Sequence, residues 1–111
     1  MFWQTPDVAL KPEIDLACWA VVETDKGERH LVGIDLSTGA GQVSSAIEAF
    51  DASAMEFRTV SGRRYRMRDG ASLADDARYA WDRWATFNGV RSWRDVTKEY
   101  ESAMAAFLAK P

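Results

Sequence analysis

IDLACWAVVETDKGERHLVGIDL, residues 14–36, is the stretch that decides the fold of this chain. Apolar residues recur at every second position of its first half, which is the period of a β-strand. Those positions are Ile14, Leu16, Cys18, Ala20 and Val22. The alternate face is also partly apolar, so we expect the strand to be covered on both sides. Asp25-Lys26-Gly27-Glu28 predicts a turn with glycine at a positive φ, and residues 29–36 predict the returning strand.

Three further strand patterns follow this hairpin. Residues 42–50, 55–60 and 63–68 also alternate, and turn residues separate them. Ser61-Gly62 predicts a tight two-residue connection, and Asp69-Gly70 predicts the end of the last strand. The segment therefore predicts a meander of about five antiparallel strands, either a sheet or a small open barrel.

The C-terminal third of the chain has helical periodicity. Ser72-Leu73-Ala74-Asp75 has the form of a helix N-cap with an acid three residues on, and Asn88-Gly89 predicts the end of that helix. A second apolar stripe runs to Leu108. Its helix begins either at a cap at Ser92 or at Thr97, with residues 92–96 as a tight turn. The predicted fold class is α+β, a sheet followed by two C-terminal helices.

The length of 111 residues fits one domain, residues 1–111. Within it we expect residues 1–12 to be an irregular lead-in, 13–70 the β-meander and 71–111 the helical part. The composition, 47% hydrophobic and 28% charged, is that of an ordinary globular protein. Much of the core is expected from five tryptophans, Trp3, Trp19, Trp81, Trp84 and Trp93.

Targeting and redox features favour a cytoplasmic protein. The first residues show neither the basic nor the apolar region of a signal peptide. No apolar run approaches the roughly 18 residues that a membrane-spanning helix needs, so no membrane partner is expected. The single cysteine, Cys18, excludes an internal disulfide and favours a reducing compartment.

Residue types that carry catalysis are scarce. The one histidine, His30, is expected roughly opposite Glu23 near the hairpin turn, at an exposed position. Cys18 would lie further along the hairpin, so a Cys–His dyad is not expected. One histidine and one cysteine do not make a zinc site without several carboxylates. We expect no cofactor, no metal and no catalytic residue, and the remaining enzymatic alternative uses carboxylates alone.

Charge is distributed unevenly along the chain. The net charge is −3, but residues 1–57 carry −7 and residues 58–94 carry +5. Alternate positions of the last predicted strand are basic, and an arginine of the neighbouring strand extends the row. These candidate binding residues are Arg58, Arg64, Arg66 and Arg68. The row either binds a nucleic acid or an acidic partner, or it is a solvated face whose arginines pair with acids of the first half.

Four segments carry a resemblance to other proteins. They are QVSSAI at residues 42–47, FD at 50–51, TVSGRRY at 59–65 and YAWDRW at 79–84. Over about residues 28–100, the chain resembles short uncharacterised bacterial and prophage-type proteins. The resemblance implies an accessory protein of a mobile element, a group in which small binders and inhibitors are common. It implies no activity and no site residue.

The favoured function is a non-catalytic interaction module, an accessory or inhibitor protein that binds a protein partner through the arginine row. The alternative is a nucleic-acid-binding domain that uses the same arginines, and the third is the small carboxylate enzyme. The second predicted helix carries an apolar stripe of Tyr100, Met104, Phe107 and Leu108. This stripe packs either on the sheet or on a copy of itself, so a homodimer is a further expectation.

Overall fold

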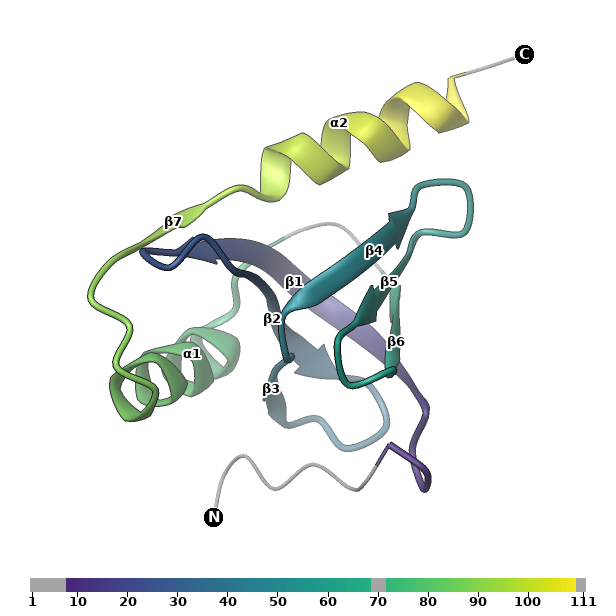
Figure 1. Ribbon diagram of the computed structural model, residues 1–111. Coiled ribbons are helices and arrows are strands. Elements are labelled where there is room, and N and C mark those ends of the chain that lie inside the picture. The colour runs from purple at the N-terminus through teal and green to yellow at the C-terminus, as the bar shows by residue number, and fades with distance from the viewer. Residues whose placement is uncertain (1–7, 69–71, 110–111) are drawn as a thin grey trace.

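The computed structural model describes residues 8–68 and 72–109 (Figure 1). In chain order its elements are β1 (Glu13–Thr24), β2 (Arg29–Asp35), β3 (Gly41–Val43), β4 (Ile47–Asp51), β5 (Glu56–Thr59), β6 (Arg64–Met67), α1 (Asp75–Phe87), β7 (Trp93–Asp95) and α2 (Thr97–Leu108). No helix among the described residues is both long and apolar enough to span a membrane. The predicted strand end at Asp69-Gly70 and residues 1–7 of the predicted lead-in lie outside the described residues.

The α+β class is confirmed. The strands form one open sheet in the order β3-β2-β1-β6-β5-β4, and β7 pairs with β1 (Figure 1). The details differ from a simple meander. β1 runs parallel to β6, so the sheet is mixed. The strand predicted over residues 42–50 is divided into β3 and β4, because residues 44–46 cross from one half of the sheet to the other. Residues 93–95 add a strand between the two helices.

β1 contains one extra residue at Cys18. The register with β2 passes from Ala17 opposite Ile34 to Ala20 opposite Val32, so three steps on β1 face two on β2. Cys18 has a φ of +48°, in the left-handed region that L residues rarely adopt. An inserted residue of this kind is a β-bulge, which bends the strand and increases its twist.

The bulge changes which residues of β1 share a face. Leu16 before it and Trp19 and Val21 after it all belong to one core cluster. Val22 belongs to a second cluster on the opposite face. The single alternation predicted across residues 14–22 is therefore wrong, because one inserted residue moves every later side chain to the other face. The prediction that this strand is covered on both sides is confirmed.

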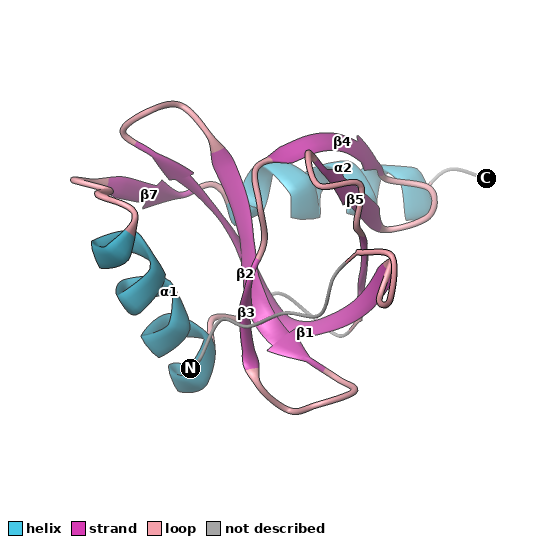
Figure 2. Ribbon diagram, turned by 60° about the horizontal axis from the view of Figure 1, so that its bottom comes forward, coloured by secondary structure: helices cyan, strands magenta, loops and turns pink. Residues whose placement is uncertain are grey.

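The two helices cover opposite faces of the β1–β2 hairpin (Figure 2). The cluster on the α2 side, called the α2 core, consists of Ile14, Leu16, Trp19, Val21, Leu31, Phe57, Tyr65, Met67, Val96 and Met104. The cluster under α1, the α1 core, consists of Val22, Val32, Val43, Ala77, Ala80, Trp81 and Ala85. Burial of this apolar surface from both sides makes β1 and β2 the centre of the structure.

α1 begins without the predicted cap but ends where the sequence predicts. It starts at Asp75 after Ala74, with no side-chain cap. The predicted cap at Ser72 is wrong, because the N–H of Ser72 donates to the carbonyl of Trp19 and ties this segment to β1. The predicted end is confirmed: the helix stops at Phe87, and Gly89 follows with a φ of +69°.

α2 begins at Thr97, as one of the two sequence interpretations predicts. Residues 93–95 do not join the helix because they pair as a strand with the end of β1. The N–H of Val96 then donates to the carbonyl of Val21, and the N–H of Val21 donates to Thr97 Oγ1 at 2.9 Å. This buried exchange attaches the first turn of α2 to β1.

Thr97→Val is expected to lower the free energy of unfolding by about 1–3 kcal/mol, because the buried N–H of Val21 loses its acceptor. Thr86→Val is the matched control. The Thr86 hydroxyl donates to the carbonyl of Asp82 on the exposed side of α1, so its loss should cost less than about 0.5 kcal/mol. Urea unfolding measures both variants, and equal losses would contradict the role of Thr97 as the anchor of α2.

Candidate functional site

The four candidate arginines lie together on the outer face of β5 and β6, with Arg68 directly after the end of β6. Tyr65 and Met67 point into the α2 core, as the alternation predicts. Arg58 of β5 is the direct cross-strand partner of Arg64, so the row extends over both strands as expected. The four arginine side chains are 41–54% exposed. The structure therefore brings all four together at the surface.

Each of these arginines has a carboxylate partner. Arg64 and Arg66 both contact Glu13, at N–O distances of 2.7 and 3.1 Å, and Arg68 contacts Asp15 at 3.1 Å. The other pairs are Arg58–Glu48 at 3.0 Å and Arg66–Glu56 at 3.5 Å. Four arginines thus face four carboxylates of the acidic first half, and their charges cancel. Exposed pairs of this kind contribute only about 0–1 kcal/mol each to stability.

A groove of about 430 Å³ lies between β4, the β1–β2 turn and α2. Its apolar lining includes Ile47 and Phe50 of β4 and Tyr100 of α2, all partly buried. The rings of Phe50 and Tyr100 meet edge to face, with centroids 5.1 Å apart. Glu28 and Glu48 bring carboxylates to the same groove. It therefore combines an apolar lining with charged groups.

The free edge of β4 borders this groove. β4 ends the strand order, so its one strand neighbour among the described residues is β5. On β5, Thr59 donates its N–H to Arg63 on the β6 side. Backbone N–H and C=O groups of successive residues point to opposite sides of a strand. Those of Arg58 therefore point toward β4, where Arg58 is paired with Ala49. Phe50, the next residue of β4, therefore directs its N–H and C=O away from β5.

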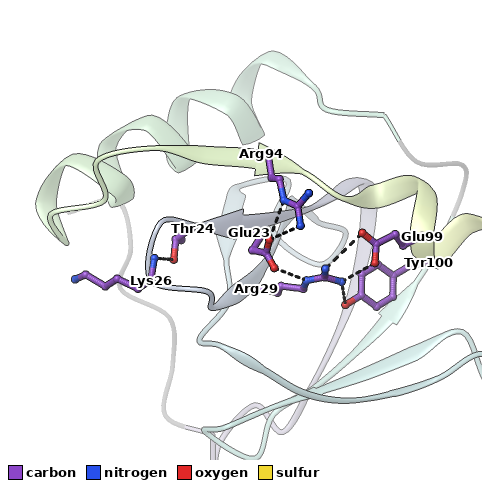
Figure 3. Close-up of polar contacts among 7 residues, drawn as sticks. All are labelled: Glu23, Thr24, Lys26, Arg29, Arg94, Glu99 and Tyr100. Atoms are coloured by element: carbon purple, nitrogen blue, oxygen red, sulfur yellow. Dashed lines mark hydrogen bonds and ion pairs between the residues drawn. The ribbon is translucent and has the colours of Figure 1, made fainter.

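Arg29 holds α2 against the hairpin at the wall of the groove (Figure 3). Its guanidinium donates to Tyr100 Oη and to Glu99, both at 3.0 Å. On its other side it donates to Glu23 at 3.2 Å, and Glu23 also accepts from Arg94 at 2.8 Å. The hydrogen bonds from Arg94 and Arg29 lower the pKa of Glu23. Those to Tyr100 and Glu99 raise the pKa of Arg29. Glu23 and Arg29 therefore stay ionised, and Arg29 holds Tyr100 in place.

His30 is buried, and its predicted exposed position opposite Glu23 is wrong. The hairpin register pairs His30 with Val22 and Glu23 with Arg29. A difference of one residue turns the side chain to the opposite face. The residue is only 3% exposed, and its ring centroid lies 4.7 Å from that of Trp84. His30 also lines a second cavity, of about 270 Å³, next to the groove.

The sequence predicted neither the groove beside β4 nor the cavity at His30. They are built from the β1–β2 turn, residues 44–46 and the helices, which only the tertiary structure brings together. The break in alternation at Ser44-Ser45 is the one sequence signal for the crossover beside them. Cys18 lies at the bulge of β1, four residues from the partner of His30. Among residues 8–68 and 72–109, no three His, Cys, Asp or Glu side chains converge as metal ligands.

Comparison of the chain with models of protein families, with curated proteins and with solved structures finds no match. The geometry alone marks the candidate sites: the arginine row, the groove beside β4 and the cavity at His30.

The wild-type arginine row is expected not to bind single-stranded DNA at about 150 mM salt, because its charges are neutralised within the fold. The double variant Glu13→Gln/Asp15→Asn removes carboxylates from three arginines and should bind labelled DNA with an affinity that falls as salt rises. Fluorescence anisotropy measures both.

The control for the DNA measurement is Asp76→Asn/Glu101→Gln, which changes the net charge equally at the two helices. It should behave like the wild type. Salt-dependent binding by the wild-type chain would show instead that the row is a nucleic-acid site.

Proposed function

We propose that this protein is a non-catalytic interaction module that binds an extended segment of a partner protein, which adds as a strand to the free edge of β4. The observation that carries the proposal is the coincidence of that edge with an apolar groove of about 430 Å³. In strand addition, main-chain hydrogen bonds give affinity and pockets for alternate side chains give specificity.

The two ends of the sheet differ in their suitability for an added strand. β3 is three residues long and lies under α1, where a Cβ on Gly41 would be 2.6 Å from the carbonyl oxygen of Asp76. β4 is five residues long and contains neither proline nor lysine, and its one register shift with β5 lies between Ile47 and Ala49, before Phe50. An added segment of five residues would extend for about 17 Å. β4 is therefore the edge at which a partner strand fits.

The lining of the groove suits side chains of such a segment. Phe50 and Tyr100 offer partly buried aromatic surface, which gives large contact area at low entropic cost. Arg29 already fixes Tyr100 through its hydroxyl, so the wall of the groove is preorganised. Binding would then require ordering of the partner segment alone.

In this proposal the protein acts as an accessory or inhibitor of its partner, the role that its resemblance to prophage-type proteins implies. The arginine row is the weaker candidate surface, because its four cations are matched by four carboxylates. Protein recognition at the groove needs no net positive charge, which agrees with an overall charge of −3.

Selection of random linear peptides on the immobilised full chain tests the proposal. Peptides selected in this way should slow the hydrogen exchange of the Phe50 amide at least about tenfold, because that N–H would donate to the added strand. NMR exchange measurements on the complex read this amide directly. Binders that leave the Phe50 amide unprotected would contradict strand addition.

A matched pair of arginine substitutions controls for the site of binding. Ala46→Arg places a long side chain in the groove and should weaken selected peptides at least about tenfold. Ala54→Arg makes the same change at an exposed position of the β4–β5 turn and should leave affinity within about twofold. Equal effects of the two variants would place the peptide elsewhere.

A further inference from the structure

The cavity at His30 continues the groove beside β4. It has a volume of about 270 Å³ and lies between the β1–β2 turn, the crossover at residues 44–46 and the end of α1. Glu28 and Ala46 line both the cavity and the groove. We propose that this cavity accepts a lysine side chain of the bound segment and seats its ammonium group beside His30 and Glu28. This inference rests on the proposed function.

Two polar atoms of the cavity residues lack partners. His30 Nε2 and Ser45 Oγ are buried and make no hydrogen bond within the described part of the chain. Both residues line the cavity. Buried polar atoms in native structures are nearly always hydrogen-bonded, because an unpaired one costs free energy. Two such atoms in one small cavity indicate a place for a polar group of a ligand.

The protonation of His30 decides what kind of group fits. Nδ1 lies 2.9 Å from the carbonyl oxygen of Ser44. A carbonyl only accepts hydrogen bonds, so Nδ1 carries the proton and donates it. In the neutral imidazole, Nε2 is then left with its lone pair. The ligand group must therefore donate a hydrogen bond to Nε2.

The other acceptors favour a cationic donor. Glu28 Oε1 lies 3.8 Å from His30 Nε2, too far for a direct hydrogen bond but close enough for one donor atom to contact both. Ser45 Oγ is a further atom of the cavity residues that can accept a hydrogen bond. An alkylammonium group is compact and carries three donors. The ring of Trp84, packed against His30, adds the aromatic surface that attracts cations.

The charged side chains that line the cavity make opposite contributions. Glu28, with its side chain 57% exposed, favours an ammonium group, whereas Lys26 opposes one. Substitution of these two residues should therefore change amine affinity in opposite directions. This sign difference separates charge recognition from simple filling of an apolar space.

The first test uses n-pentylammonium chloride as the probe and the full chain at about pH 8. Nitrogen-15 NMR of the imidazole should show a saturable shift of His30 Nε2. The neutral analogue 1-pentanol should cause no comparable shift. An equal response to 1-pentanol, or to sodium chloride at the same ionic strength, would overturn the assignment.

Three variants then test the proposed contacts. Glu28→Gln should weaken pentylammonium binding about tenfold, and Lys26→Gln should strengthen it severalfold. Glu48→Gln is the matched control, since it removes a similarly exposed carboxylate that lines the groove but not the cavity. It should leave affinity within about twofold. Equal effects of Glu28→Gln and Glu48→Gln would overturn the site.

The peptides selected for strand addition separate this inference from the proposed function. Replacement of a lysine in them by norleucine should weaken binding about tenfold. If norleucine has no effect and pentylammonium does not bind, while the Phe50 amide is still protected, the lysine cavity is overturned and strand addition stands. If pentylammonium binds as expected but no peptide protects Phe50, strand addition is overturned and the amine site stands alone.

Discussion

The bulge at Cys18 is the constraint on which the rest of the structure depends. A regular strand presents one set of side chains to each face, and β1 needs apolar residues on both faces along its length. The extra residue keeps Leu16 and Val21 in the α2 core although they differ in parity, and it turns Val22 to the α1 core. Both helices can then pack on one hairpin. The same strand also pairs with β2, β6 and β7, so most of the chain is attached to it.

The groove follows from this arrangement. β1 shares one edge between two neighbours: β6 pairs along residues 13–16 and β7 along residues 22–24. The strands β6, β5 and β4 therefore continue the sheet from the first half of β1, whereas β7 leads α2 across its second half (Figure 2). β4 comes back toward the β1–β2 turn without pairing with it. Tyr100 of α2, held at the hairpin by Arg29, forms the remaining wall of the groove.

Much of the fold could be predicted from local pattern. Turn glycines such as Gly27, with a φ of +81°, and the buried face of Tyr65 follow from short-range stereochemistry and period. The bulge could not be predicted. β1 has apolar residues on both faces, so the hydrophobic pattern does not show where one inserted residue reverses the faces. His30 illustrates the consequence of register. A shift of one residue in the hairpin pairing decides whether its side chain is exposed or buried. The groove unites segments far apart in the sequence, which no local pattern encodes.

The residues that look most functional in the sequence are not those with unpaired polar atoms in the structure. The arginines are the most conspicuous candidates in the sequence, yet the parallel register sets Arg64 beside Glu13 and Arg66 beside Asp15. A slip of one residue would place the arginines beside the apolar face of β1, so the charge pattern helps to specify how β1 and β6 align. The opposite net charges of residues 1–57 and 58–94 are thereby explained, at least at this strand pair, by ion pairs within the chain. Polar atoms without a hydrogen-bond partner among the described residues lie instead in the cavity, at His30 Nε2 and Ser45 Oγ. The lysine side chain of the proposed bound segment would supply hydrogen-bond donors to both of these atoms.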